Sequence, residues 1–315
     1  MTFRIALATA FACAIAISAP KAEAEQFINV LTGGTSGVYY PLGVALSDIY
    51  GKGIEGARTQ VQATKASVEN LNLIEQGKGE IAFTLGDALA LAWEGNVEAG
   101  FKTPLKKLRI VAAIYPNYVQ IAALQEAGVT TIADMKGKTL SVGAAKSGTE
   151  LNARAILGAA GLSYDDLAKV EYLPFAESVE LMKNRQLEAT LQSSGLGNAA
   201  IKDLASSQAI SIVSIPVEVA TAMGMPYMPA TIPAGTYQGQ DGDVATVAVG
   251  NYLVTSEDVP EEVVYQMTRL IFENLDVLKA AHSAGADISL DKAAKNPPVP
   301  LHPGAERFYR EQGKL

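Results

Sequence analysis

The order of hydrophobic and polar residues divides the first third of the chain into alternating strands and helices. Short apolar runs bounded by glycine, proline or polar residues are typical of strands, and apolar residues spaced by three or four positions are typical of helices. The runs predict strands at 28–31, 59–64, 80–85 and 108–115. The spacing predicts helices at 38–50, 67–76 and 88–93. This alternation indicates an α/β architecture.

The same pattern restarts after Pro116, which we expect to end the strand at 108–115. The second set of predicted strands is 119–124, 139–142, 170–173, 189–192 and 210–215, with helices at 131–137, 147–160, 178–184 and 198–206 between them. The tail adds an apolar strand at 244–255, a long helix at 260–281 opened by Pro260, and a polar helix at 306–312.

A pattern that runs twice and then returns predicts two lobes. We assign residues 25–114 to a first lobe, 115–229 to a second lobe, and 230–315 to a return to the first lobe and C-terminal helices. At least two crossings then join the lobes. Ligands of open α/β sheets bind in crevices at the carboxyl ends of strands, so the cleft between the lobes is the expected site.

Residues 1–24 have the features of a secretory signal peptide. Arg4 provides a small basic region, residues 5–17 form an apolar core too short for a stable membrane span, and Ala22-Glu23-Ala24 matches a small-x-small cleavage pattern. We expect cleavage after Ala24 and a mature chain in the periplasm. Cys13 lacks the preceding leucine of a lipoprotein signal, so lipidation is not expected.

Composition narrows the classes of function. The only cysteine is Cys13, so the mature chain has no disulfide, no thiol nucleophile and no cysteine ligand for a metal. The full chain carries a formal net charge of −8, which argues against binding nucleic acid. An anionic ligand would therefore need local donors that overcome the field of the whole protein.

Two strand-turn-helix segments carry the strongest candidate chemistry. In the first, residues Gly33 to Gly37 lead from an apolar strand into a helix; in the second, Ser147-Gly148-Thr149 opens a helix. The first N–H groups of a helix have no partner inside it and attract carboxylates or phosphates. One turn from each lobe could clamp one small anion. The alternatives are a plain strand-to-helix turn and an ordinary capping box formed by Ser147 and Glu150.

Other polar residues are candidates for ligand contact, each with a structural alternative. Lys65 could neutralise a carboxylate or be a solvated surface lysine, and Ser67 opens the helix at 67–76 as its cap. Asp87 could bind an ammonium group or cap the next helix. Tyr115 could cover an apolar part of a ligand or lie in the core. Gln192, Ser193 and Ser194 form a polar turn that would face the cleft.

A catalytic centre is not apparent in the sequence. The chain lacks G-x-S-x-G and H-E-x-x-H, and its two histidines, His282 and His302, lie in the tail, where His302 fits a structural turn. A G-x-G-x-x-A match begins at Gly195 and includes Gly197, so the alternative function is an exported enzyme with a dinucleotide site there. A structural or adhesion role is a third possibility. We expect no cofactor.

Six blocks in order along the mature chain resemble the TAXI family, the extracytoplasmic solute-binding proteins of tripartite ATP-independent periplasmic (TRAP) transporters. The blocks are TGGTSGVYYPLG at 32–43, SVENL at 67–71, LSVGA at 140–144 followed by SGTE at 147–150, PATIPAGTY at 229–237, IFENL at 271–275 and PLHPGAERFY at 300–309. The resemblance implies a two-lobed periplasmic-binding-protein fold of type II that closes on its ligand like a Venus flytrap. It also implies delivery of that ligand to an ion-driven membrane permease.

The resemblance and the local chemistry together give the expected ligand-binding residues. They are Gly34, Thr35, Ser36, Gly37, Tyr39, Lys65, Ser67, Asp87, Tyr115, Ser147, Gly148, Thr149, Gln192, Ser193 and Ser194. The expected partners are a small anionic solute and, transiently, the TRAP permease, with the binding protein acting as a monomer.

The chain departs from the family pattern at three places near this site. Lys65-Ala66 replaces a common Gly-Gly pair, Leu85-Gly86-Asp87 replaces a frequent Gln-Ser-Asp, and Asn117 stands near a usual acidic residue. An added lysine and a lost acid favour a ligand without an amino group. We therefore expect a dicarboxylate such as 2-oxoglutarate or a C4 acid in preference to glutamate.

Overall fold

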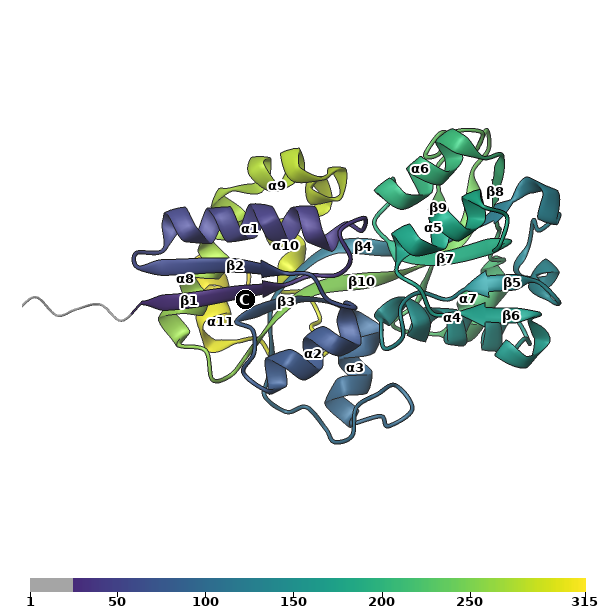
Figure 1. The fold of residues 1–315 in the computed structure, drawn as a ribbon. Coiled ribbons are helices and arrows are strands. Elements are labelled where there is room, and N and C mark those ends of the chain that lie inside the picture. Colours follow the sequence, from purple (N-terminus) through teal and green to yellow (C-terminus); the bar gives the residue numbers. More distant parts are fainter. Residues whose placement is uncertain (1–24) are drawn as a thin grey trace, which may run out of the picture.

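The computed structural model describes residues 25–315. The predicted signal peptide and Cys13 lie outside the described residues. Figure 1 shows two α/β lobes side by side, with two long strands running from one into the other.

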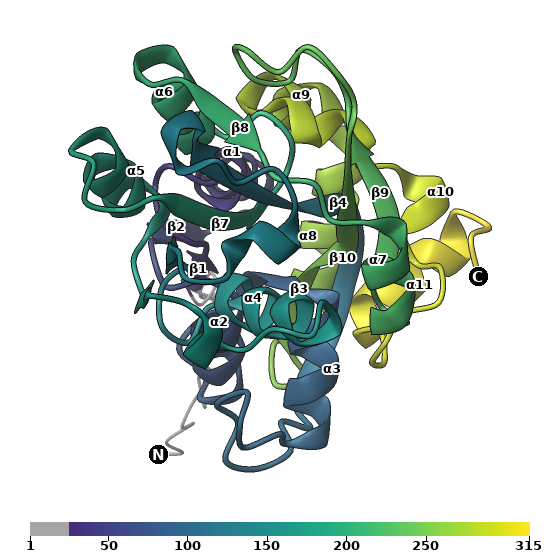
Figure 2. The same ribbon diagram turned by 90° about the vertical axis from the view of Figure 1, so that its right-hand side faces the viewer.

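The first lobe combines the start of the chain with its end. Its elements are β1 (Gln26–Leu31), α1 (Tyr39–Gly53), β2 (Ala57–Gln62), α2 (Ser67–Glu75), β3 (Ile81–Leu85), α3 (Gly86–Glu94), α8 (Glu261–Glu273), α9 (Leu275–Ala281), η4 (Ser283–Asp287), α10 (Leu290–Ala293) and α11 (Pro303–Glu311). Figure 2 shows α10 and α11 at the right of the view and α2 and α3 in its lower half.

The second lobe is built from the middle of the chain. Its elements are η1 (Gln125–Ala127), η2 (Ile132–Met135), β5 (Thr139–Ser141), α4 (Gly148–Ala159), η3 (Tyr164–Asp166), β6 (Lys169–Glu171), α5 (Phe175–Lys183), β7 (Ala189–Ser194), α6 (Ala199–Ser207), β8 (Ile210–Ile212), α7 (Val217–Met223) and β9 (Met228–Ile232).

Two long antiparallel strands, β4 (Leu108–Leu124) and β10 (Val244–Ser256), connect the lobes. The sheet order is β2-β1-β3-β10-β4-β7-β5-β6, with β8 beside β4 and β9 beside β10. In the first lobe β10 pairs with β3 through residues 251–254, and in the second it pairs with β9 through 244–248. Both strands thus cross between the lobes near Tyr115 and Asn251.

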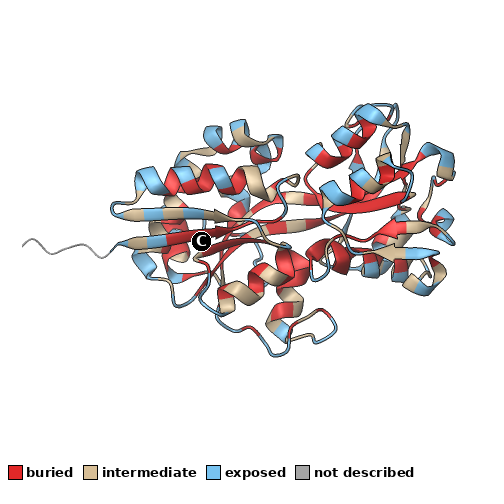
Figure 3. Cartoon of the chain, viewed as in Figure 1, coloured by how far each residue is buried: buried red, intermediate tan, exposed pale blue. Residues whose placement is uncertain are grey.

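Each lobe buries apolar residues on both faces of its part of the sheet. In the first lobe one core lies under α1 and α8 and another under α2 and α3; in the second lobe α4 and α7 cover one face, and α5 and α6 cover the other. Every residue of β3 is buried, which explains its continuous apolar run. Figure 3 shows the buried residues along the central strands of both lobes.

The packing of residues just beyond 230 indicates where the chain returns to the first lobe. Ile232 and Tyr237 lie in the core beneath α5 and α6, and β9 pairs with the first half of β10. We therefore propose that the second lobe continues past residue 230 and that the return occurs within β10.

Two predictions of element ends are wrong. Pro116 does not end a strand, because β4 continues through it opposite Gly250, where a register irregularity accommodates the missing N–H donor. The helix predicted at 260–281 is two helices, because Asn274 has the non-helical angles φ −125° and ψ 32°. The local hydrophobic periodicity predicted neither the continuation of β4 through Pro116 nor the break between α8 and α9 at Asn274.

Candidate functional site

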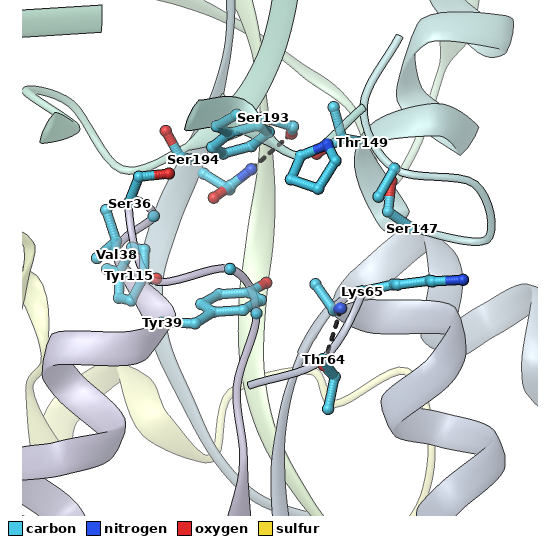
Figure 4. Close-up of a pocket in the computed structure, with 18 residues that line it drawn as sticks. Ser36, Val38, Tyr39, Thr64, Lys65, Tyr115, Ser147, Thr149, Ser193 and Ser194 are labelled. Atoms are coloured by element: carbon cyan, nitrogen blue, oxygen red, sulfur yellow. Dashed lines mark hydrogen bonds between the residues drawn. The ribbon is translucent and has the colours of Figure 1, made fainter. Parts of the chain in front are cut away.

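A cavity of about 110 Å³ lies between the lobes, next to the crossing strands (Figure 4). It is lined by Gly33, Gly34, Ser36, Gly37, Val38, Tyr39, Thr64, Lys65, Ala66, Tyr115, Asn117, Ala144, Ser147, Thr149, Pro174, Phe175, Ser193 and Ser194. Figure 4 shows Ser147, Thr149, Ser193 and Ser194 on one side and Tyr39, Thr64 and Lys65 opposite them.

The wall from the first lobe is the turn between β1 and α1. The Gly37 N–H donates to the Gly34 carbonyl at 3.1 Å, which closes a tight turn before the helix. Val38 occupies the N-cap position of α1 and offers no side-chain hydrogen bond there. The first N–H groups of α1 can therefore donate hydrogen bonds to solvent or to a bound ligand.

Lys65 lies on the same side of the cavity, in the loop before α2. Ala66 has a positive φ of 69°, and its N–H donates to the Thr64 hydroxyl at 2.9 Å, so the loop folds back on itself. Lys65 is exposed and is the only charged residue among those that line the cavity in the described chain. A positive charge at the edge of an otherwise uncharged lining favours an anion.

The wall from the second lobe is the start of α4. Ser147 is its N-cap, and its hydroxyl oxygen accepts from the Glu150 N–H at 3.1 Å. Half of the predicted capping box is therefore confirmed. The Glu150 carboxylate instead accepts from Arg154 at 2.6 Å and from the Tyr164 hydroxyl at 3.0 Å. The Ser147 hydroxyl can therefore still donate a hydrogen bond to a bound ligand.

The lobes are in contact around this cavity. A Cβ built on Gly148 would lie 2.6 Å from Ser67 Oγ and 2.7 Å from Leu85 Cδ1, across the interlobe boundary. One built on Gly195 would lie 3.2 Å from Val38 Cγ2. The structure therefore shows a closed arrangement, and Gly148 is a glycine because the opposite lobe occupies the space of a side chain.

A chain of buried hydrogen bonds runs behind the cavity from lobe to lobe. Each side chain donates to the next, in the order Tyr39, Asn251, Asn117, Ser193, Asn152 and Asp87, at distances between 2.5 and 3.2 Å. Hydrogen bonds in series polarise one another, so the chain orients its members. It also uses the hydroxyl protons of Tyr39 and Ser193, which leaves only their lone pairs to face the cavity.

Asp87 ends this chain as an interlobe latch. Its Oδ2 accepts from Asn152 and from the Tyr227 hydroxyl, both at 2.6 Å, and both donors belong to the opposite lobe. Burial raises the pKa of Asp87 above its usual value, against the lowering effect of the Tyr227 hydrogen bond. Removal of one member of such a buried pair is costly, because the other is left without a partner.

Two predicted helix caps are wrong. Asp87 lies inside α3, whose N-cap residue is Leu85, and Ser67 lies inside α2, whose N-cap residue is Ala66. The Ser67 hydroxyl instead accepts from the Leu85 N–H at 3.1 Å and so ties α2 to β3. In both cases the polar side chain is used for tertiary contact near the interlobe boundary.

Two tyrosines contribute neutral hydroxyls. Burial raises the pKa of Tyr39 and that of Tyr115, so neither ionises near neutral pH. The Tyr115 hydroxyl is buried and has no hydrogen-bond partner in the described chain. Together with Ser36, Ser147 and Thr149, it gives the cavity several uncharged donors.

The structure brings ten of the expected ligand-binding residues to the cavity. These are Gly34, Ser36, Gly37, Tyr39, Lys65, Tyr115, Ser147, Thr149, Ser193 and Ser194. The other five do not line it: Thr35 is exposed, Ser67, Asp87 and Gly148 are buried near the interlobe boundary, and Gln192 is buried within the second lobe.

The sequence analysis missed Thr64, Asn117 and Phe175 as lining residues. Asn117 was missed because the strand was expected to end at Pro116, one residue earlier. Phe175 lies at the start of α5, which begins three residues before its predicted position. A longer strand would have placed Asn117 beside Tyr115, but no local signal marks Phe175.

The turn proposed as an alternative dinucleotide site is filled by protein. A Cβ on Gly195 would lie 3.1 Å from Ala284 Cβ, and the Gly197 N–H already donates to the Tyr237 hydroxyl at 3.1 Å. Asn198 caps α6 with its own side chain. A pyrophosphate needs close approach to free N–H groups, and the Gly197 N–H and the start of α6 are already used by these contacts.

The histidines have structural roles in the described residues. Nδ1 of His302 accepts from the Gly304 N–H and caps α11, while Nε2 lies 3.0 Å from the Val259 carbonyl oxygen. The prediction that His302 belongs to a structural turn is confirmed. Nδ1 of His282 accepts from the Ala284 N–H and caps η4.

Residues 25–315 contain no candidate metal site and no candidate membrane span. No group of acidic, histidine or cysteine side chains there has the arrangement of a metal site. Within the same range, no helix is both long and apolar enough to cross a bilayer.

Two solved structures that share this fold hold a small bound solute. The alkanesulfonate-binding protein SsuA from Xanthomonas axonopodis pv. citri, bound to MOPS, is 14% identical over 93% of each chain, with a TM-score of 0.52. PhnD1 from Prochlorococcus marinus, in complex with methylphosphonate, is 11% identical over 93% of this chain and 100% of its own, with a TM-score of 0.58. At these identities the likeness shows the fold, and it confirms the expected two-lobed periplasmic-binding-protein architecture.

The chain therefore has the fold of these periplasmic proteins. It belongs to the NMT1-like family, whose model matches residues 30–313. The assignment to the TAXI family of TRAP transporters stays a prediction.

Proposed function

We propose that this protein captures a small carboxylate in the periplasm and delivers it to a membrane permease. One observation carries the proposal: a cavity between two lobes is faced by two helix N-termini and one lysine, and none of the described residues that line it is acidic. Free N–H groups and hydroxyls bind carboxylate oxygens, and the helix dipoles add to their attraction. MOPS, which SsuA binds, and methylphosphonate, which PhnD1 binds, both carry an anionic group and support this chemistry.

The proposed class of ligand is based on Lys65 and Asn117, two positions where the chain departs from the TAXI family pattern. A lysine at the cavity edge favours negative charge, and within residues 25–315 the lining has no carboxylate that would hold an ammonium group. Asp87 does not fill that role in this closed arrangement, because its Oδ2 is held by Asn152 and Tyr227. We therefore propose a dicarboxylate such as 2-oxoglutarate or a C4 acid, in preference to glutamate.

Closure of the lobes would couple binding to delivery. The ligand would stabilise the closed form through its greater affinity for that form, and the permease would recognise the closed surface. The six sequence blocks at 32–43 and beyond favour a permease of the TRAP type, driven by an ion gradient. Uptake into vesicles that contain the permease should then stop when the sodium gradient is collapsed and continue when ATP is depleted.

The direct test is thermal unfolding of the protein that starts at the predicted cleavage site, stripped of bound solute. The panel contains C4 and C5 dicarboxylates, glutamate, glutamine, sugars and NAD. A ligand at 100 times its Kd adds about 2.7 kcal/mol, which raises the melting temperature by several degrees. A shift with one family of acids supports the proposal. A shift with NAD and none with the acids would favour the exported enzyme.

A further inference from the structure

Two buried glutamines on neighbouring strands of the second lobe differ in their hydrogen bonding. Gln120 on β4 and Gln192 on β7 are cross-strand partners, and both are fully buried. The Gln120 amide is fully used: its Nε2 donates to Ser194 Oγ and to the Ser194 carbonyl, both at 3.1 Å, and its Oε1 accepts from the Tyr237 hydroxyl. In the described chain, neither the nitrogen nor the oxygen of the Gln192 amide has a partner.

An amide buried in this way is exceptional. Most buried polar atoms have at least one hydrogen bond, and each that lacks one reduces stability. The nearby Thr190 hydroxyl is also buried without a partner in the described part of the chain. Side chains alternate along a strand, so Thr190, Gln192 and Ser194 lie on one face of β7.

This face leads directly to the cavity. Ser194, two residues beyond Gln192, lines the cavity, and α5 covers the same face of the sheet. Pro174 and Phe175, where α5 begins, line the cavity too. The Gln192 amide therefore belongs to the layer immediately behind the wall that Ser194 and Phe175 form.

We propose that Gln192 is a specificity residue of the solute site, whose amide turns toward the cavity and recognises a neutral oxygen of the bound acid. This inference rests on the proposed function. An amide offers one donor group and one acceptor without charge, so it suits a hydroxyl or a carbonyl oxygen. A buried second carboxylate would need a cation, and the residues of this face are neutral in the described structure. The preferred substrates are thus hydroxy- or oxo-acids.

Matched pairs of acids test the inference. The pairs are malate with succinate and 2-oxoglutarate with glutarate, measured by calorimetry on the purified protein. We expect the wild type to prefer the oxygenated acid of at least one pair by tenfold or more, because a site that bonds a hydroxyl rejects the analogue without it. In the Gln192→Met variant that preference falls below about threefold, while affinity for the other acid of the pair is kept.

Stability gives a second readout that needs no ligand. Gln192→Met removes an unpartnered amide and raises the melting temperature of the solute-free protein by about 2 °C. The matched control is Gln120→Met, which has the same residue type, burial and sheet position. It removes satisfied hydrogen bonds and lowers the melting temperature by several degrees. Gln192→Leu serves as a second variant should Gln192→Met fail to fold, with a loss of oxygen preference again expected.

The outcomes separate the two proposals. If no carboxylate binds the wild type, the proposed function fails and this inference fails with it. If acids bind but the oxygenated ones are not preferred, or if Gln192→Met and Gln192→Leu keep the preference, the inference alone is overturned. An unchanged or lower melting temperature for Gln192→Met, together with unchanged selectivity, would show that an internal water satisfies the amide, and this result too overturns the inference.

Discussion

The two walls of the cavity are both strand-turn-helix segments, yet they present different donors. In the first lobe, Val38 leaves the start of α1 without a side-chain cap, and Gly34 is exposed. In the second lobe, Ser147 caps α4 with its own hydroxyl, and Gly148 is packed against the opposite lobe. The same local motif thus supplies free N–H groups on one side and a rigid, hydroxyl-bearing wall on the other.

The difference teaches how closure makes the site. The first wall can meet a solute before the lobes close, because its donors face the cavity without tertiary support. The second wall is complete only when α4 packs against Ser67 and Leu85. Variants at the interlobe boundary should therefore affect affinity more than variants of single contacts.

The largest effect is expected from Gly148→Val. Its side chain would collide with Ser67 Oγ and Leu85 Cδ1 and would hold the lobes apart, so affinity should fall by about 100-fold or more. The matched control is Gly158→Val in the same helix, where a Cβ meets nothing within 4 Å. Calorimetry should show near-normal binding for Gly158→Val. Equal binding by the two variants would mean that this contact is not needed for capture.

The second-largest effect is expected in the pH dependence of affinity, through the interlobe hydrogen bonds of Asp87. Because burial raises the pKa of Asp87 above its usual 3.8, closure favours the protonated carboxyl. Its contribution to the closed state is fully present below pH 3.8 and is lost as pH rises through the raised pKa, so affinity should fall as pH rises in that window. Tyr39 and Tyr227, which face it, stay neutral because burial raises the pKa of each.

Asp87→Asn should remove this pH dependence, which amounts to about tenfold in affinity for each unit by which the pKa is raised. Affinity measured at a series of pH values checks the prediction. The control is Asp134→Asn, because hydrogen bonds from Thr131 and Thr130 lower the pKa of Asp134 to about 2 and keep it ionised. A persisting pH slope in Asp87→Asn would place the titrating group elsewhere.

The third effect separates capping from binding. Ser147→Ala loses the bond to the Glu150 N–H, which should cost about 1 kcal/mol of stability, and it removes a donor from the cavity, which should weaken binding about tenfold. Ser163→Ala is the control, since Ser163 caps η3 in the same way but does not line the cavity. The two variants should melt similarly and bind differently. Similar affinities would assign Ser147 to capping alone.

The smallest effect is expected from Lys65→Gln. Lys65 is exposed, so its charge is screened, and affinity should fall about threefold at low salt and not at all in high salt. Lys52→Gln, which changes an exposed lysine on α1 paired with Asp48, controls for the change in net charge. If both variants bind equally at low salt, Lys65 does not contact the solute.

Much of the fold could be predicted from sequence because its signals are local. The periodicity of α1 and the apolar run of β3 depend on nearest neighbours, and both were placed within a few residues. The length of β4 could not be predicted, because the pairing with β10 and β7 overrides the proline inside it. Long-range pairing leaves no periodic trace around Pro116.

The site, too, has some features that local sequence predicts and others that depend on long-range contacts. Turns such as Gly34 to Gly37 are recognisable from composition, whereas the hydrogen bonds from Asn251 to Asn117 and from Asn152 to Asp87 join residues far apart in sequence. Asp87 looked like a helix cap because a short acidic residue after a strand is typical of one. Its partners, on α4 and beside β9, become visible only in three dimensions.

The most direct test of capture between the lobes is a crystal structure with the best-binding acid from the thermal panel. We predict the acid in the cavity, with one carboxylate against the first N–H groups of α1 and another oxygen within hydrogen-bond distance of Ser147 or Thr149. Contacts to both lobes would support the account. An acid bound to one lobe only, or at a surface site such as the hollow beside Tyr164 and Tyr172, would contradict it.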